Sequence, residues 1–127
     1  MFGGWVKYNT SFIADIGPLV DQATGGTPLN AFSTRPTPKI MLNGGTANSA
    51  TNTLIFAANT SGMWKLVITS AEASTLGELT IVLDVSASNP VCRPFAIHYQ
   101  VLPAETYERL MVTSKGMDSK KYVSTFN

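Results

Sequence analysis

Three stretches of the chain alternate between apolar and more polar positions, at residues 64–68, 79–85 and 95–101. Their in-phase apolar positions are Trp64, Leu66, Ile68, Leu79, Ile81, Leu83, Val85, Phe95, Ile97, Tyr99 and Val101. Such alternation is typical of strands that bury one face, because successive side chains point to opposite faces of a sheet. With short connections and no long helical pattern, it predicts an antiparallel all-β sandwich of about seven strands.

Turn signals separate further strands. Residues 5–16 are extended in character, and shorter apolar runs follow at residues 39–43 and 53–57. Asn-Gly-Gly at 43–45 is a strong turn signal, because Asn and Gly adopt positive φ at little cost. Residues 23–37 are rich in Gly, Pro, Thr and Ser, which predicts a long loop or an irregular edge segment.

Two short helical turns are expected as connectors. In the first, Thr69 and Glu72 have the spacing of a capping box, and Gly77 can end the turn in a left-handed conformation. We expect Leu76 to hold this turn against the core, because so short a helix is unstable alone. The second turn begins at Pro103, which suits the first helical position.

The pattern divides the chain into four segments. Residues 1–11 are predicted to be an N-terminal arm, residues 12–102 the sandwich domain, residues 103–112 a short C-terminal helix and residues 113–127 a C-terminal tail. Terminal segments that carry aromatic residues but have no core of their own gain order only against a partner. Both termini are therefore candidate docking arms.

The amino-acid composition limits which classes of binding partner are expected. Charged residues make up only 13% of the 127-residue chain, about half the usual share of roughly 25%. The polar surface must therefore come from Thr, Ser and Asn, a composition common in proteins packed into assemblies. The net charge is +1 and the basic residues are scattered, so no nucleic-acid partner is expected.

Neither a membrane span nor a disulfide is expected. No apolar run approaches the length of about 20 residues that a spanning helix needs, and the first residues lack the pattern of a secretory signal. Cys92 is the only cysteine, so no intrachain disulfide can form. We expect synthesis in a reducing cytoplasm.

No residues are placed for catalysis or metal binding. If Cys92 and His98 share a strand, about 20 Å separates them, too far for a nucleophile–base pair. The thiol is expected to be semi-buried and the imidazole to lie at the surface. Asp15 and Asp21 flank a turn and are expected to cap it rather than bind calcium. The sequence thus predicts neither enzyme activity nor a cofactor.

The two tryptophans have different expected roles. Trp64 is in phase with its apolar neighbours, so it is predicted to pack in the core. Trp5 lies near a terminus and is a candidate for an interface. An exposed tryptophan can also stack on a sugar ring, so a glycan-binding module stays open as an alternative.

Several motifs occur in a familiar order. They are residues 16–21 (IGPLVD), 26–28 (Gly-Thr-Pro), 39–45 (KIMLNGG), 62–64 (GMW), 69–77 (TSAEASTLG), 89–91 (NPV) and 101–110 (VLPAETYERL). Through these motifs, which cover about residues 12–110, the chain resembles a family of small Ig-like β-sandwich structural proteins and modules of tailed bacteriophage virions. The loop after Gly45 departs from this pattern, because it is rich in Asn, Ser and Thr where the family continues with an aromatic strand.

The resemblance implies a role in the virion without enzyme activity or a metal. We expect a capsid decoration or cement protein, present in many copies or as a homo-oligomer, that binds the major capsid protein or other virion proteins. The alternative is a tail, neck or fibre-anchoring adaptor of the particle. Binding would use the sandwich surface and the terminal arms. The interface candidates are Phe2, Trp5, Tyr8, Tyr107, Tyr122 and Phe126.

Overall fold

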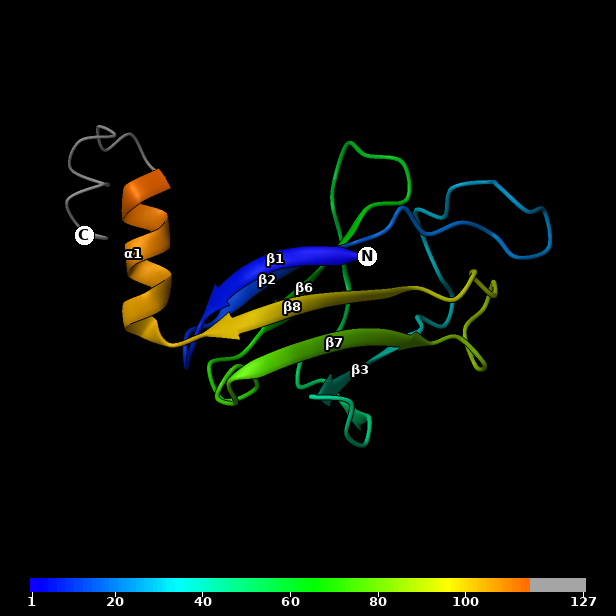
Figure 1. The fold of residues 1–127 in the computed structure, drawn as a ribbon. Coiled ribbons are helices and arrows are strands. Elements are labelled where there is room, and N and C mark those ends of the chain that lie inside the picture. Colours follow the sequence, from blue (N-terminus) through cyan, green and yellow to red (C-terminus); the bar gives the residue numbers. More distant parts are fainter. Residues whose placement is uncertain (115–127) are drawn as a thin grey trace.

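The computed structural model describes residues 1–114, which form two β-sheets and a helix (Figure 1). The strands are β1 (Phe2–Lys7), β2 (Phe12–Ile16), β3 (Thr37–Leu42), β4 (Asn48–Ser49), β5 (Ile55–Phe56), β6 (Trp64–Ile68), β7 (Gly77–Asp84) and β8 (Ala96–Leu102), and the helix is α1 (Ala104–Ser114). One sheet has the strand order β1-β8-β7-β3-β4 and the other the order β2-β6-β5. The prediction of an all-β sandwich is confirmed.

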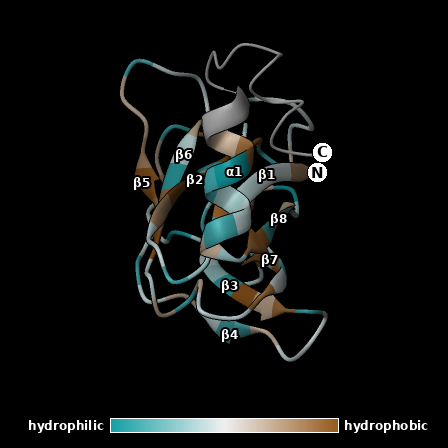
Figure 2. Cartoon of the chain, turned by 60° about the vertical axis from the view of Figure 1, so that its left-hand side comes forward, coloured by the Kyte–Doolittle hydropathy of each residue, from teal (hydrophilic) through white to brown (hydrophobic). Residues whose placement is uncertain are grey.

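The three alternating stretches became β6, β7 and β8, with the predicted side chains turned inward. β6 has the burial pattern of a strand with one fully buried face, from Trp64 through Leu66 to Ile68. β7 pairs antiparallel with both β3 and β8. Figure 2 shows apolar residues concentrated in the strands of both sheets. Burial of these apolar faces between the sheets is the main source of stability.

Trp64 is the largest buried side chain of this core. Its indole Nε1 donates a hydrogen bond to the carbonyl oxygen of Leu29 at 2.9 Å. The rings of Phe32 and Phe56 lie 5.3 and 5.4 Å from the Trp64 ring, between centroids. The indole therefore joins the irregular segment before β3 to the small sheet, as its predicted core position requires.

The N-terminal segment is a strand and not the predicted arm. β1 pairs parallel with β8, with Val6 opposite Val101, and the Val6 side chain is buried in the core. The amide of Tyr8 continues the pairing by donating to the carbonyl oxygen of Leu102 at 2.9 Å. The expectation of a purely antiparallel sandwich is wrong at this pair, and residues 2–7 belong to the sandwich.

The first predicted helical turn is a single hydrogen-bonded turn. Its capping box is confirmed, because the Thr69 amide donates to Glu72 at 2.8 Å and the Glu72 amide donates to the Thr69 hydroxyl at 3.2 Å. The prediction that Leu76 packs into the core is wrong, since this side chain is 48% exposed. Ala73 is buried instead, because a turn this short presents the residue four positions after Thr69 to the core.

The C-terminal helix forms close to its predicted position. It spans Ala104–Ser114 where residues 103–112 were expected. The amide of Tyr107 donates to the carbonyl oxygen of Pro103 at 2.9 Å, which places Pro103 at the start of the first turn. The helix lies across the ends of β1 and β8 (Figure 1). Of the predicted C-terminal tail, residues 115–127 lie outside the described part.

Candidate functional site

An exposed aromatic surface lies on β1, at the edge of the five-stranded sheet. Phe2 and Trp5 are 53% and 51% exposed, and Tyr8 follows the strand with a partly exposed ring. The rings of Phe2 and Trp5 meet edge to face, with centroids 6.0 Å apart. On the neighbouring strand, His98 lies 5.7 Å from the Phe2 ring between centroids. We call Phe2, Trp5 and His98 the aromatic edge.

The local sequence explains why these rings point outward. The pairing register shifts between Phe2 and Gly4, which marks a bulge in β1. After the bulge Val6 faces the core, so Trp5 before it faces solvent. Gly4 adopts a φ of 124°, in the range that favours glycine. An irregularity of this kind re-aims side chains and is frequent at sheet edges.

Helix α1 contacts the C-terminal end of β1. The Lys7 ammonium lies 2.6 Å from Oε1 of Glu108 on α1. Tyr107 is half-buried, so it offers less surface for binding than Phe2 or Trp5. Of the six predicted interface residues, Phe2, Trp5 and Tyr8 are brought to one strand and its end. Tyr122 and Phe126 lie outside the described residues.

Cys92 and His98 do not form a catalytic pair. Cys92 is fully buried in the core cluster, where it was expected to be only semi-buried. It pairs with Asp21 in an isolated bridge, outside β8. His98 projects from the opposite face of the large sheet, between the inward-facing Ile97 and Tyr99. Burial raises the pKa of the Cys92 thiol, which keeps it protonated and poorly nucleophilic.

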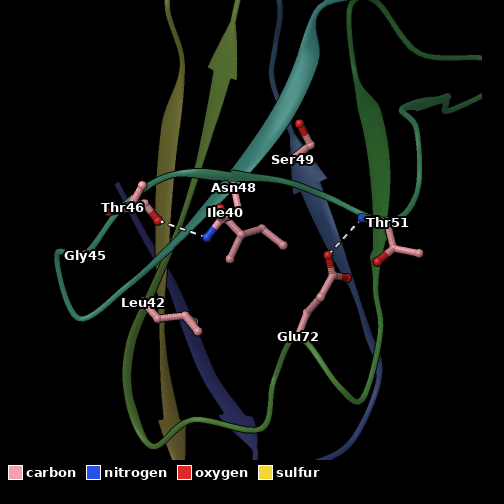
Figure 3. A pocket seen from close by; sticks show the side chains of 8 residues that line it. All are labelled: Ile40, Leu42, Gly45, Thr46, Asn48, Ser49, Thr51 and Glu72. Carbon is pink, nitrogen blue, oxygen red and sulfur yellow. Dashed lines mark hydrogen bonds between the residues drawn. The ribbon is translucent and has the colours of Figure 1, made fainter.

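A pocket of about 390 Å³ opens beside the β3–β4 hairpin (Figure 3). Its apolar lining comes from Ile40 and Leu42, and its polar lining includes Asn48 and Glu72. The Glu72 carboxylate points into this region but has partners already, since Oε2 accepts from the Thr51 amide at 2.9 Å and Oε1 completes the capping box. The Glu72 carboxylate therefore connects two loops, and both of its oxygens already accept hydrogen bonds.

The prediction of turn capping is confirmed for Asp21, whereas the Asp15 side chain accepts no hydrogen bond from the turn among the described residues. Oδ1 of Asp21 accepts from the Ala23 amide at 2.8 Å, which is the predicted turn cap. Asp15 lies exposed on β2. Within residues 1–114, no three His, Cys, Asp or Glu side chains come close enough together to hold a metal ion.

Comparison with known proteins adds no relative. No family model, no curated protein and no solved structure matches this chain. Among the described residues, α1 is neither long nor apolar enough to span a bilayer.

Sequence reasoning missed the exposed residues of the small sheet. Ile13 on β2 and Ile55 on β5 are 61% and 50% exposed. Both residues stood in stretches expected to be extended, but no face was assigned to them. The signal was present for Ile13, because Phe12, Ala14 and Ile16 form an inward set by alternation that leaves Ile13 outside.

Proposed function

We propose that this protein is a structural component of a tailed-phage virion, a decoration or cement protein bound to the outer capsid. The family resemblance of residues 12–110 motivates the virion context. The observation that carries the binding role is the aromatic edge, where Phe2 and Trp5 are both about half exposed on an edge strand.

The chemistry of this edge suits protein–protein binding. Large aromatic side chains, and Trp above all, dominate the energetics of protein interfaces. An edge strand also presents unpaired backbone N–H and C=O groups, which a partner can use for strand addition. Since Val6 and the pairing with β8 fix β1 to the core, the exposed rings are held in place before binding. Such preorganisation lowers the entropy that binding must offset.

The partner in this proposal is the major capsid protein or another virion protein. Many copies on a symmetric particle would supply avidity, so each contact can be modest. A tail, neck or fibre-anchoring adaptor would use the same edge, and the position of the protein on the particle separates the two roles.

The test is rebinding to particles that lack the protein. Purified wild-type protein and the variant Phe2→Ser/Trp5→Ser are incubated with such particles, and occupancy is measured after sedimentation. We expect the double variant to lose at least about tenfold in affinity, which corresponds to the loss of interface anchors. Leu76→Ser is the matched control, because Leu76 is similarly exposed but lies outside β1, directly before β7.

Two results would overturn the proposal. One is wild-type protein that does not bind particles at any concentration, and the other is equal binding by wild type and Phe2→Ser/Trp5→Ser. Deletion of residues 1–8 is not a usable test, because it removes β1 and the buried Val6. Glycan-array binding that depends on Trp5 would instead favour the glycan-binding alternative.

A further inference from the structure

A second exposed surface lies on the outer face of the three-stranded sheet. It consists of Ile13 and Asp15 on β2, Lys65 and Val67 on β6, and Ile55 on β5. Their strand neighbours Ala14, Ile16 and Leu66 are fully buried, so alternation directs these five side chains outward. Apart from Met1, Ile13 is the most exposed large hydrophobic residue in the described part of the chain. We call these five residues the small-sheet face.

The pairing register arranges this face in two rows. Ile13 lies opposite Val67, and Asp15 lies opposite Lys65, which has Ile55 on its other side. The first row is therefore apolar, and the second carries one acid and one base. Although they are cross-strand neighbours, Asp15 and Lys65 form no ion pair of 4.0 Å or less, and neither is ion-paired elsewhere within residues 1–114.

We propose that the small-sheet face binds a second copy of this chain. A two-fold axis that runs along the strands, between β2 and β6, places Asp15 of each copy over Lys65 of the other. The same axis places Ile13 over Val67 of the second copy. Closed dimers require such a self-complementary patch, and facing sheets pack about 10 Å apart, a distance that these side chains can bridge.

The charge pattern favours a second copy over other occupants. An apolar partner would bury Asp15 and Lys65 without new partners, which is unfavourable for both charges. A strongly acidic or basic partner would match one charge and repel the other. A partner surface satisfies both charges when it places a base over Asp15 and an acid over Lys65. A second copy of this chain supplies this arrangement.

The small area of this face predicts a weak dimer. Stable interfaces bury about 800 Å² on each partner, from 20 or more residues, and the small-sheet face has only the five residues named above. Self-association should therefore depend strongly on protein concentration and fall at high salt. The proposal does not rest on the virion role, because it concerns the purified protein alone.

Charge reversal tests the proposed pairing by analytical ultracentrifugation. We expect wild-type protein to dimerise as its concentration rises, and Asp15→Lys and Lys65→Asp to weaken dimerisation by at least about tenfold each, because like charges then face each other. An equimolar mixture of the two variants should dimerise again, since both basic side chains of one copy then face both acidic side chains of the other. The double variant Asp15→Lys/Lys65→Asp should dimerise like wild type.

A matched control lies on the other sheet. Glu78→Lys makes the same charge change on β7 as Asp15→Lys makes on β2, and it should leave dimerisation unchanged. Thermal unfolding of each variant by circular dichroism shows that it is folded. Wild-type protein that stays monomeric up to about 1 mM would overturn the proposal. So would single variants that dimerise like wild type, or a mixture that fails to restore the dimer.

Discussion

The backbone of Gly3 lies directly against the ring of Tyr99. A Cβ atom at Gly3 would stand 2.5 Å from Cζ and 2.9 Å from Cδ1 of that ring, too close for any side chain. Tyr99 is itself fixed in the core on β8 and packs on Phe12 with 4.9 Å between ring centroids. This contact fixes the position of the first half of β1, and therefore also the position of the aromatic edge.

Gly3→Ala should therefore destabilise the protein. The added methyl group must push β1 or Tyr99 aside, and overpacking of this kind costs about 1–3 kcal/mol. The free energy of unfolding, measured with urea, checks this value. Gly26→Ala is the matched control, because a Cβ there meets nothing within 4 Å, and it should change stability by less than about 0.5 kcal/mol. Equal stability of the two variants would mean that β1 does not rest on Tyr99.

The two tryptophans should respond differently to replacement by phenylalanine. Trp64→Phe removes the buried indole N–H, leaves the Leu29 carbonyl without that donor and opens a cavity. We expect a loss of about 2–4 kcal/mol in the free energy of unfolding. Trp5→Phe should leave stability nearly unchanged, since Trp5 is half exposed. Urea unfolding followed by circular dichroism measures both, and a larger effect from Trp5 would contradict the assignment.

Glu72→Ala should weaken both the capping box at Thr69 and the attachment of the loop at Thr51. The carboxylate accepts from the Thr69 amide and the Thr51 amide, so its removal leaves both amides without their partner. The expected loss is about 1–2 kcal/mol, with faster hydrogen exchange at the Thr51 amide. Glu78→Ala serves as the control, because the Glu78 side chain is exposed and makes only a 3.4 Å contact with Thr80. Unchanged exchange at Thr51 would show that Glu72 does not hold that loop.

Stability should fall at alkaline pH. Burial raises the pKa of the Cys92 thiol above 9.0 and that of the Tyr99 hydroxyl above 10.0, their ordinary values. Groups whose pKa is raised on folding contribute stability below the ordinary value and lose it as pH rises through the folded value. The free energy of unfolding should therefore decrease as the pH rises above 9.0, the ordinary pKa of the thiol, and Cys92→Ala should flatten the first part of this decrease. An identical pH dependence in Cys92→Ala would rule out the thiol as its source.

Much of the sandwich could be predicted, because one buried face imposes alternation. β6, β7 and β8 each carry such a face, and the predicted in-phase residues of β6 and β7 from Trp64 to Leu83 are buried. The same physics could not reveal β1. Gly3 and Gly4 interrupt its pattern, and its parallel partner β8 lies at the other end of the chain, so no hairpin signal joins them.

The candidate surfaces were predictable in part. The exposure of Phe2 and Trp5 was anticipated from their place near a terminus, but their fixed position on an edge strand depends on a long-range pairing. Leu76 was misplaced because the length of the Thr69 turn cannot be read from its caps alone. Cys92 was placed too near the surface, because its burial arises from contacts with the irregular segment after β2.

The most direct test of the proposed function is a cryo-electron microscopy map of the particle that carries this protein. We predict density for the two-sheet sandwich on the outer capsid surface, with β1 and the rings of Phe2 and Trp5 turned toward the capsid subunits. A sandwich bound through another face, with the Trp5 ring in solvent, would contradict the assigned surface. Absence of the protein from the particle would contradict the virion role itself.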